Sequence, residues 1–261
     1  MDGVNKTLYI PLYGKAYVSK KDIILKDVTA EEIWEKEGFP LKGKAKSKWL
    51  AYSMGMRSAV FDGWLKMYME QYPEAEVLHI GCGMDSRIYR VGAGKHQWYD
   101  VDFPEVIEER KRYYEEGENY HMIASDARNP MLLQDVPKGG QAIILLEGIS
   151  MYLTPEELNG LFKTLAGHFE MAYLLMDCYT VMAAKASKYK NPINEVGVTT
   201  VYGVDDGNVP AENTGFTMIK EWDMTPESLV NQLKGSERMI FRKVFGGKFA
   251  KKLYRMYEYQ K

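Results

Sequence analysis

Two glycines and a later carboxylate stand at a spacing that could hold a small ligand. The stretch "VLHIGCGMDSR" ends an apolar run at Gly81 and Gly83, where the missing Cβ atoms let the backbone approach a ligand closely. Asp102 follows Gly81 by 21 positions and closes the run "WYDVD". A carboxylate at that distance, at the end of the next strand, can accept hydrogen bonds from ribose hydroxyls. The pattern favours a ligand with an adenosine part, and Asp100 on the same strand face is the alternative to Asp102.

The loop lacks features that a dinucleotide needs. Ser86 stands where a dehydrogenase fingerprint has its third glycine, which brings helix and strand together and seats the pyrophosphate. Asp85 beside the turn would repel phosphates, yet it suits a cationic ligand. A GxG turn alone also occurs in ordinary strand-to-helix connections, so the spaced Asp102 is what favours a ligand. The residues thus disfavour NAD and favour a phosphate-free, cationic adenosine compound, of which S-adenosylmethionine is the obvious one.

Alternating strands and helices are expected to position these residues. Short apolar runs bounded by Gly, Pro or charge predict strands at 75–81, 96–103, 120–125, 141–148 and 171–178. Between them, helices are predicted at 104–116 and 154–169. The second has Thr154 as N-cap and Glu157 at capping-box spacing. This alternation predicts an α/β fold, a parallel sheet wound with helices on both sides.

The flanking segments differ from this core, and we expect one domain over 1–261. Residues 1–73 are predicted to be a helical N-terminal extension and 74–178 the ligand-binding core. Residues 179–215 are rich in Gly, Asn, Asp and Pro and are expected to form a loop-rich cap insert. Residues 216–261 would complete the sheet. There we expect a strand at 216–224, a helical stretch around 226–253 and an edge strand at 254–261.

Composition excludes several classes of protein. The chain has 261 residues and a net charge of −2, which gives no electrostatic footprint for nucleic acid. No apolar run approaches the roughly 20 residues that span a bilayer, and the first residues lack the pattern of a signal peptide. Two cysteines and four scattered histidines predict neither a disulfide framework nor a metal site. We therefore expect a cytoplasmic protein without nucleic-acid, membrane or metal partners.

Four sequence blocks together resemble one enzyme family. They are "VLHIGCGMDSRIYR", "WYDVDFPEVIEERK", "HMIASDARNP" and "LLEGISMYLTPEEL", preceded by "TLYIPLYGKAYVSKKDIILKD". In order and spacing they resemble the leucine carboxyl methyltransferase family, in its bacterial small-molecule branch of the tetracenomycin polyketide synthesis O-methyltransferase type. The resemblance covers roughly residues 7 to 180. It implies a class I methyltransferase fold, with seven mostly parallel strands of which the last is antiparallel, and S-adenosylmethionine as methyl donor.

The resemblance also implies roles for residues at the ends of the strands. Gly81 and Gly83 would line the methionine and ribose part of the donor, and Asp102 would accept the ribose hydroxyls. Asp126 and Ala127 would meet the amino edge of the adenine. Asp126 has an ordinary alternative role, because Asp commonly caps a turn.

Further residues would complete the donor and acceptor sites. By the same resemblance, Glu147 would lie beneath the donor's amino group or sulfonium, and Lys15 and Arg57 would hold its carboxylate. Without the resemblance, we would interpret Lys15 as a surface lysine and Arg57 as part of a structural ion pair. Glu147 ends an apolar run, where an unpaired carboxylate is costly to bury, so a function is expected. Tyr152 and Tyr202 are candidates for contact with an aromatic acceptor.

The chemistry expected of such a site is alignment more than acid–base catalysis. A donor sulfonium is already activated, so the protein mainly orients the acceptor and removes water. We single out no histidine of the motif blocks as a candidate base, which favours a carboxylate or acidic phenol acceptor, and we assign no catalytic acid or base. We expect an O-methyltransferase of a small polyketide-like or aromatic molecule. Methylation of a protein's C-terminal carboxylate and non-catalytic donor binding are the alternatives. A large charged docking surface would favour the protein acceptor, and the sequence predicts none. It also leaves the oligomeric state open.

Overall fold

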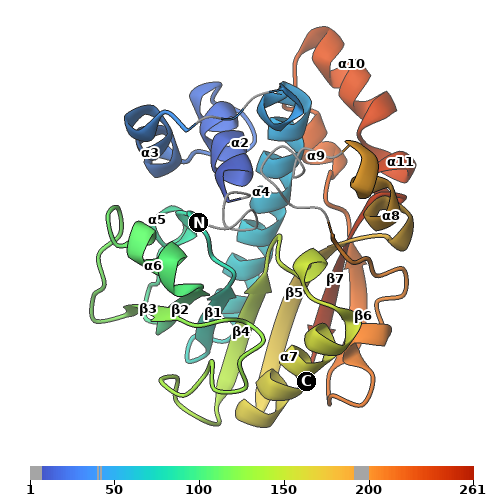
Figure 1. Ribbon diagram of the computed structural model, residues 1–261. Helices are drawn as coiled ribbons and strands as arrows, with labels where there is room; N and C mark the ends of the chain where they lie inside the picture. Colours follow the sequence, from blue (N-terminus) through green and yellow to red (C-terminus); the bar gives the residue numbers. More distant parts are fainter. Residues whose placement is uncertain (1–7, 40, 42, 191–199) are drawn as a thin grey trace.

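The computed structural model describes residues 8–39, 41, 43–190 and 200–261, and their centre is a seven-stranded sheet (Figure 1). The strand order is β3-β2-β1-β4-β5-β7-β6. All neighbours from β3 to β5 are parallel, whereas β7 runs antiparallel to both β5 and β6. The expected mostly parallel sheet with an antiparallel last strand is therefore confirmed. The strands are β1 Glu76–Ile80, β2 Trp98–Asp102, β3 Tyr120–Ala124, β4 Gln141–Leu146, β5 Met171–Tyr179, β6 Thr217–Trp222 and β7 Tyr254–Gln260.

The last strand was expected at the sheet edge, and this expectation is wrong. β7 lies between β5 and β6, and β6 forms the edge. The sequence of β7 alternates, but the polar Glu258 is buried together with its neighbours. Its carboxylate accepts hydrogen bonds from the indole nitrogens of Trp64 and Trp222, at 3.0 and 2.6 Å. Because these partners satisfy the carboxylate, an alternating strand can be covered on both faces.

One face of the sheet is covered by α4, Lys48–Gln71, which contacts β4. The helix α2, Tyr9–Lys20, packs on α4, and α3, Val28–Glu37, packs on α2, beyond the carboxyl ends of the strands (Figure 1). Phe61, Trp64 and Leu65 of α4 belong to the same buried cluster as Ile143 and Leu145 of β4. Successive side chains of a strand point to opposite faces, so Ala142, Ile144 and Leu146 of β4 pack in the buried cluster on the other face of the sheet. The helical N-terminal segment predicted from the sequence is thus found.

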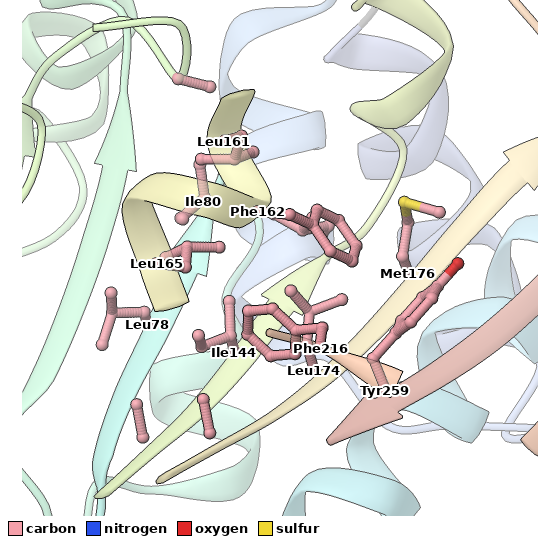
Figure 2. Close-up of a cluster of buried hydrophobic side chains, with 14 of the residues drawn as sticks. Leu78, Ile80, Ile144, Leu161, Phe162, Leu165, Leu174, Met176, Phe216 and Tyr259 are labelled. Atoms are coloured by element: carbon pink, nitrogen blue, oxygen red, sulfur yellow. The ribbon is translucent and has the colours of Figure 1, made fainter. Parts of the chain in front are cut away.

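The opposite face is covered by α7, Pro155–His168 (Figure 2). The predicted capping box is confirmed: the Thr154 hydroxyl accepts from the Glu157 amide, and the Glu157 carboxylate accepts from the Thr154 amide. Leu161, Phe162 and Leu165 pack in one cluster with strand residues, where Figure 2 shows them beside Ile144, Leu174 and Tyr259. Burying each such side chain contributes about 1.5–3 kcal/mol, which fixes the helix against the sheet.

Several elements differ from the prediction at their ends. The helix predicted at 104–116 ends early, as α6 Pro104–Arg110. The predicted 226–253 stretch is broken into α9 Glu227–Val230, α10 Gly235–Val244 and α11 Gly247–Lys251. Gly235 and Gly247 adopt left-handed φ values of +53° and +60°, which interrupt a helix. The insert, expected to be loop-rich, contains α8 Val181–Lys190.

The remaining short elements connect these layers. They are η1 Gly43–Lys46, α5 Arg87–Val91, η2 Ser150–Tyr152 and η4 Val209–Ala211. Among the described residues, none of the helices combines the length and the apolar character required to cross a bilayer.

Candidate active site

A cavity opens where the strand order of the sheet reverses. β1 is flanked by β2 and β4, so the chain leaves the carboxyl ends of β1 and β4 in opposite directions and forms a crevice there. A cavity of about 660 Å³ occupies this end of the sheet, roofed by residues of α2 and α4. Its lining includes nine of the residues singled out from sequence: Lys15, Arg57, Gly81, Gly83, Asp102, Asp126, Ala127, Glu147 and Tyr152.

Tyr202 is the exception among the predicted site residues. It is not part of the cavity lining, and its side chain is exposed. Its backbone amide donates to the carbonyl of Met151, at 2.8 Å. This bond holds the backbone of Tyr202 in place but does not orient its phenol group. The geometry therefore gives no support to Tyr202 as a contact of the acceptor.

The glycine loop after β1 is shaped by left-handed backbone. Gly81 has φ +74° and Gly83 has φ +52°. A Cβ on Gly81 would lie 2.8 Å from Cδ1 of Ile149. The Gly83 amide donates to Oδ2 of Asp102, at 2.7 Å, so the loop is held by the strand-end carboxylate. At the place of the missing third glycine, Ser86 donates to Asp27 near α3 instead of bringing helix and strand together.

The two aspartates of β2 have different surroundings. The half-buried carboxylate of Asp102 lines the cavity and accepts from the Gly83 and Phe103 amides. Burial raises its pKa, although both amide bonds oppose the rise. Asp100 is fully buried outside the cavity lining and is paired with Arg110. Burial opposes its ionisation, but chiefly the Arg110 charge lowers the pKa of Asp100 to about 2. Of the two alternatives, Asp102 is the one that faces the cavity.

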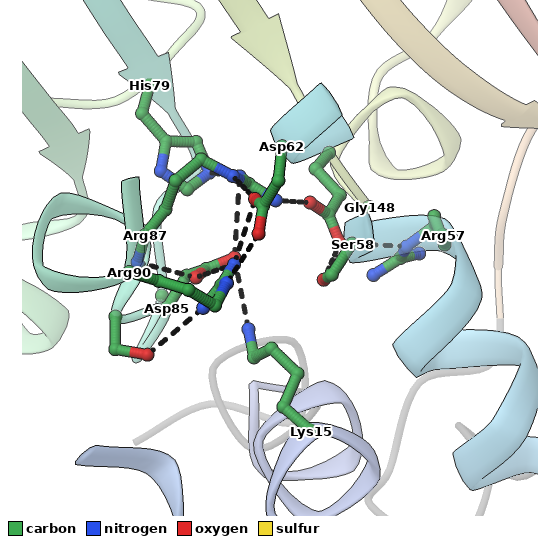
Figure 3. Close-up of polar contacts among 12 residues, drawn as sticks. Lys15, Arg57, Ser58, Asp62, His79, Asp85, Arg87, Arg90 and Gly148 are labelled. Atoms are coloured by element: carbon green, nitrogen blue, oxygen red, sulfur yellow. Dashed lines mark hydrogen bonds and ion pairs between the residues drawn. The ribbon is translucent and has the colours of Figure 1, made fainter. Parts of the chain in front are cut away.

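Glu147 lies directly after β4 at the centre of a buried ionic network, and its partners Arg57, Ser58 and Arg87 are labelled in Figure 3. One carboxylate oxygen accepts from Nε of Arg57 at 3.0 Å and from the Ser58 hydroxyl at 2.8 Å, and the other pairs with Arg87. Burial disfavours its charge, yet Arg87 and Arg57 lower the pKa of Glu147 to about 2. The carboxylate is therefore ionised at neutral pH.

Lys15 and Arg57 bring cationic groups from the N-terminal helices to the cavity. Lys15 of α2 is buried, and its Nζ lies 3.0 Å from Oδ2 of Asp85 in the glycine loop. Arg57 of α4 donates to Asp177 at 3.1 Å and to the Tyr254 hydroxyl at 3.2 Å, in addition to Glu147. Arg57 thus has the structural ion pairs that the sequence suggested as an alternative role, and it also lines the cavity.

Asp126 likewise combines a local role with a place in the lining. Its carboxylate accepts from the Arg128 amide at 2.9 Å, as in an Asx turn, and pairs with the Arg128 guanidinium. Ala127 beside it is buried. Asp126 and Ala127 follow β3, and β2 lies between β3 and β1 in the sheet. The two residues are therefore separated from the end of β1 by Asp102, which ends β2.

Sequence reasoning missed Arg87, Arg90 and Asp62. Arg87 has no exposed surface and lies over the Phe61 ring, with Nε 2.6 Å from Asp62. Arg90, one turn further along α5, pairs with Asp62, Asp85 and Asp27. Figure 3 shows Asp62, Arg87 and Arg90 gathered around Asp85. The available signal was Asp62 within the apolar helix "SAVFDGWL", because a charge in such a position needs a partner.

A second part of the cavity wall is mainly apolar. It is lined by α2, α4, α8, α11 and the segment around η2. Tyrosines at positions 152, 179 and 254 add phenol groups to this wall. Its other contributors include Ile10, Leu50, Met54, Met151 and Leu253.

Comparison with known proteins identifies the family. The family model for leucine carboxyl methyltransferase matches residues 11–166. The chain belongs to the leucine carboxyl methyltransferase family. A relative in this family's small-molecule branch, the tetracenomycin polyketide synthesis O-methyltransferase TcmP of Streptomyces glaucescens, is 25% identical over 92% of this chain and 90% of its own length. An S-adenosyl-L-methionine-dependent methyltransferase of Gibberella zeae is 27% identical over 65% of this chain and 62% of its own.

Solved methyltransferases share the fold. Magnesium protoporphyrin IX methyltransferase from Synechocystis PCC 6803, with bound SAH, superposes with a TM-score of 0.52 at 12% identity, covering 90% of this chain and 94% of the other. Geranyl diphosphate methyltransferase in complex with SAM gives a TM-score of 0.53 at 13% identity, covering 85% and 92%. With the family assignment, this leucine carboxyl methyltransferase family member is an S-adenosylmethionine-dependent methyltransferase.

The cavity wall fits the chemistry of this donor. S-adenosylmethionine carries a sulfonium, an ammonium group and a carboxylate, so its site needs both anionic and cationic side chains. The strand-end wall supplies the carboxylates of Asp102 and Glu147 and the cations of Lys15 and Arg57. Gly81 and Gly83 line the same wall, and the missing Cβ of Gly81 makes room for the Ile149 side chain, which also lines the cavity.

Proposed function

We propose that this methyltransferase transfers the methyl group to an oxygen of a small aromatic or polyketide-like acceptor, a carboxylate or a phenol. The observation that carries the proposal is a single cavity that joins a charged wall at the strand ends to an apolar, tyrosine-rich wall. Pockets for planar, lipophilic molecules have such linings, with few polar groups to orient the ligand. The name of the Streptomyces relative, a polyketide O-methyltransferase, supports the same acceptor class.

The strand-end wall would hold the nucleoside part of the donor. Asp102 would accept the ribose hydroxyls, and the ordered bond from the Gly83 amide to its carboxylate fixes the carboxylate in place beforehand. Gly81 and Gly83 would lie along the methionine and ribose part. Asp126 and Ala127 would meet the adenine edge, in the loop that follows β3.

The helical roof would hold the amino-acid part of the donor. Lys15 and Arg57 would bind its carboxylate, and Glu147 would face its amino group or sulfonium. All three already take part in buried ion pairs that set their positions before any ligand enters. Tyr152 would contact the acceptor, since it lines the apolar wall.

Catalysis would rest on orientation and on exclusion of water. The donor supplies a methyl group that is already activated by the positive sulfur. The buried network of Arg57 and Glu147 keeps the adjoining wall rigid, and the apolar wall removes water from the acceptor. Burial raises the pKa of Tyr254 well above its usual range, so its phenol stays protonated at neutral pH. Tyr254 is therefore not a base, and its phenol proton is directed to the Asp177 carboxylate.

Donor binding is the first test of this proposal. S-adenosylmethionine and S-adenosylhomocysteine should raise Tm in a thermal-shift assay, and NAD should leave it unchanged. Stabilisation by NAD alone would contradict the assignment of the cavity.

Acceptor choice is the second test. The enzyme should release S-adenosylhomocysteine when supplied with aromatic carboxylates or phenols. Peptides ending in a free carboxylate serve as the comparison. Turnover of the peptides alone would favour a protein carboxyl methyltransferase, and donor binding without turnover of any acceptor in a broad screen would favour a non-catalytic binder.

A further inference from the structure

The segment that carries α10 and α11 is strongly basic. Residues 234–252 contain seven of the chain's 34 Lys and Arg residues but only one of its 36 Asp and Glu residues. The chain as a whole has a net charge of −2, so positive charge is concentrated here against an acidic remainder. Such a local excess produces a positive surface potential that the overall charge conceals.

Most of these charges are not neutralised within the protein. Glu237, the acidic residue of the segment, pairs with Lys48 of α4, and Arg242 pairs with Glu227. Five other basic residues are exposed and form no ion pair within the described part of the chain: Lys234, Arg238, Lys243, Lys251 and Lys252.

Large apolar side chains are exposed among these charges. α10 buries Phe241 against Tyr52 of α4, which fixes its inner face. On its other sides Met239, Ile240 and Val244 remain 66%, 42% and 44% exposed. In and after α11, Phe249 and Leu253 are 51% and 37% exposed. We call the exposed side chains of residues 234–247 and 249–253 the α10–α11 surface.

This surface borders the mouth of the cavity. Phe249 and Leu253 belong both to the surface and to the cavity lining. Figure 1 shows α10 at the periphery of the molecule, with α11 close to α8. The hydroxyl of Thr180, just before α8, donates to the carbonyl of Lys252, which ties the two helices together beside the opening.

We propose that the α10–α11 surface binds the anionic face of a lipid bilayer, with Lys and Arg meeting the headgroups and apolar side chains entering the interface. Short helices that present basic residues together with bulky apolar ones are typical of such interfacial binding. A second copy of this chain is a poor occupant, because two surfaces of like charge would repel. The sequence led us to expect no membrane partner because no segment spans a bilayer, but peripheral binding needs no spanning helix. Bound in this way, the enzyme would turn its cavity mouth toward the lipid phase.

Vesicle co-sedimentation tests this inference without any methyl acceptor. The protein is mixed with vesicles of phosphatidylcholine alone or of equal parts phosphatidylcholine and phosphatidylglycerol. We expect sedimentation with the mixed vesicles only, and weaker binding as salt is raised, since exposed charges are screened.

Two variant pairs separate charge from apolar insertion. Lys243→Glu with Lys251→Glu should weaken binding at least roughly 30-fold, because each basic residue near an anionic surface contributes about fivefold. Lys66→Glu with Lys163→Glu, which reverses two exposed lysines outside this surface, should change binding far less.

The second pair removes apolar groups without altering charge. Ile240→Ser with Val244→Ser should weaken binding roughly tenfold or more. The control is Met131→Ser with Ile219→Ser, at residues that are also exposed but lie outside the surface. None of the altered residues lines the cavity, so an unchanged thermal shift with S-adenosylhomocysteine verifies that each variant is folded.

Three outcomes would overturn the inference. They are absence of sedimentation with mixed vesicles, equal sedimentation with both kinds of vesicle, and binding that the serine pair leaves unchanged. If the serine pair leaves vesicle binding unchanged and the protein is also retained on immobilised polyaspartate, the surface would be assigned to an acidic protein partner instead. That result would favour the protein-acceptor alternative.

Discussion

Replacement of Arg87 by Met tests whether the buried ionic network stabilises the donor loop. The methionine keeps an unbranched apolar stem over the Phe61 ring and removes the charge. Glu147 then loses one partner and keeps Arg57 and Ser58, while Asp62 loses one and keeps Arg90. Removal of one member of a buried pair costs about 3–5 kcal/mol, and the remaining partners place this variant at the lower end.

The assay is equilibrium unfolding at neutral pH, followed by the same measurement in acid. A loss of about 3 kcal/mol lowers Tm by roughly 6–10 °C in a chain of this size. In the native protein the pKa of Glu147 is about 2, below its ordinary 4.5, so its contribution to stability is present above 4.5 and is lost as pH falls toward 2. Without Arg87 that pKa rises toward its ordinary value, so the difference in stability between the native protein and the variant should shrink as pH falls from 4.5 toward 2.

Arg112→Met is the matched control. Arg112 also pairs with two carboxylates, Glu37 and Glu109, but its side chain is half exposed. Its replacement should leave Tm unchanged, because solvent screens such pairs. A deficit in Arg87→Met below about 1 kcal/mol, the level of surface pairs, would refute the role of the network. A deficit that does not vary with pH would show that packing, and not charge, is what the residue contributes.

Three further predictions concern the donor site. Asp102→Asn should weaken S-adenosylhomocysteine binding by about 1–3 kcal/mol in calorimetric titration, while Asp135→Asn, outside the cavity, should not; equal affinities would remove Asp102 from the site. Gly81→Ala should lower the free energy of unfolding by about 1–3 kcal/mol, because φ is +74° and the new Cβ meets Ile149. Gly117→Ala, where the space is open, should be tolerated, and similar losses in both variants would contradict this reasoning. In Glu147→Gln, the free energy of unfolding, measured with urea at several pH values, should fall less steeply between pH 4.5 and about 2 than in the native protein. An equally steep fall in both proteins would assign the acid dependence to other residues.

Features encoded within a few neighbouring residues could be predicted from the sequence. The start of α7 follows from Thr154 and Glu157, whose side chains and amides satisfy one another locally. The approach of the strand ends follows from the order of apolar runs, because parallel strands place their carboxyl ends together. Gly81, Gly83 and Asp102 were therefore predicted to lie near one another, and they do.

Features that depend on distant partners could not be predicted. Arg87 can be buried because Asp62 of α4 and Glu147 after β4 approach it, and no pattern in the sequence around Arg87 predicts these two partners. The interior place of β7 depends on Trp64 and Trp222, which satisfy Glu258 from separate elements. The helix α8 was missed because Gly, Asn and Pro in the rest of the insert outweighed its own helix-forming Ala, Met and Lys.

The interior position of β7 constrains how the chain can fold during synthesis. β6 is made before β7, but among the described strands β7 is its single partner, and so β6 has no place to dock until β7 emerges. Until then the apolar edge of β5 presents unpaired backbone, which is the kind of edge that recruits other chains. β7, which is translated after the other six strands of this sheet, thus joins β6 to the rest of the sheet and removes the exposed edge in a single step.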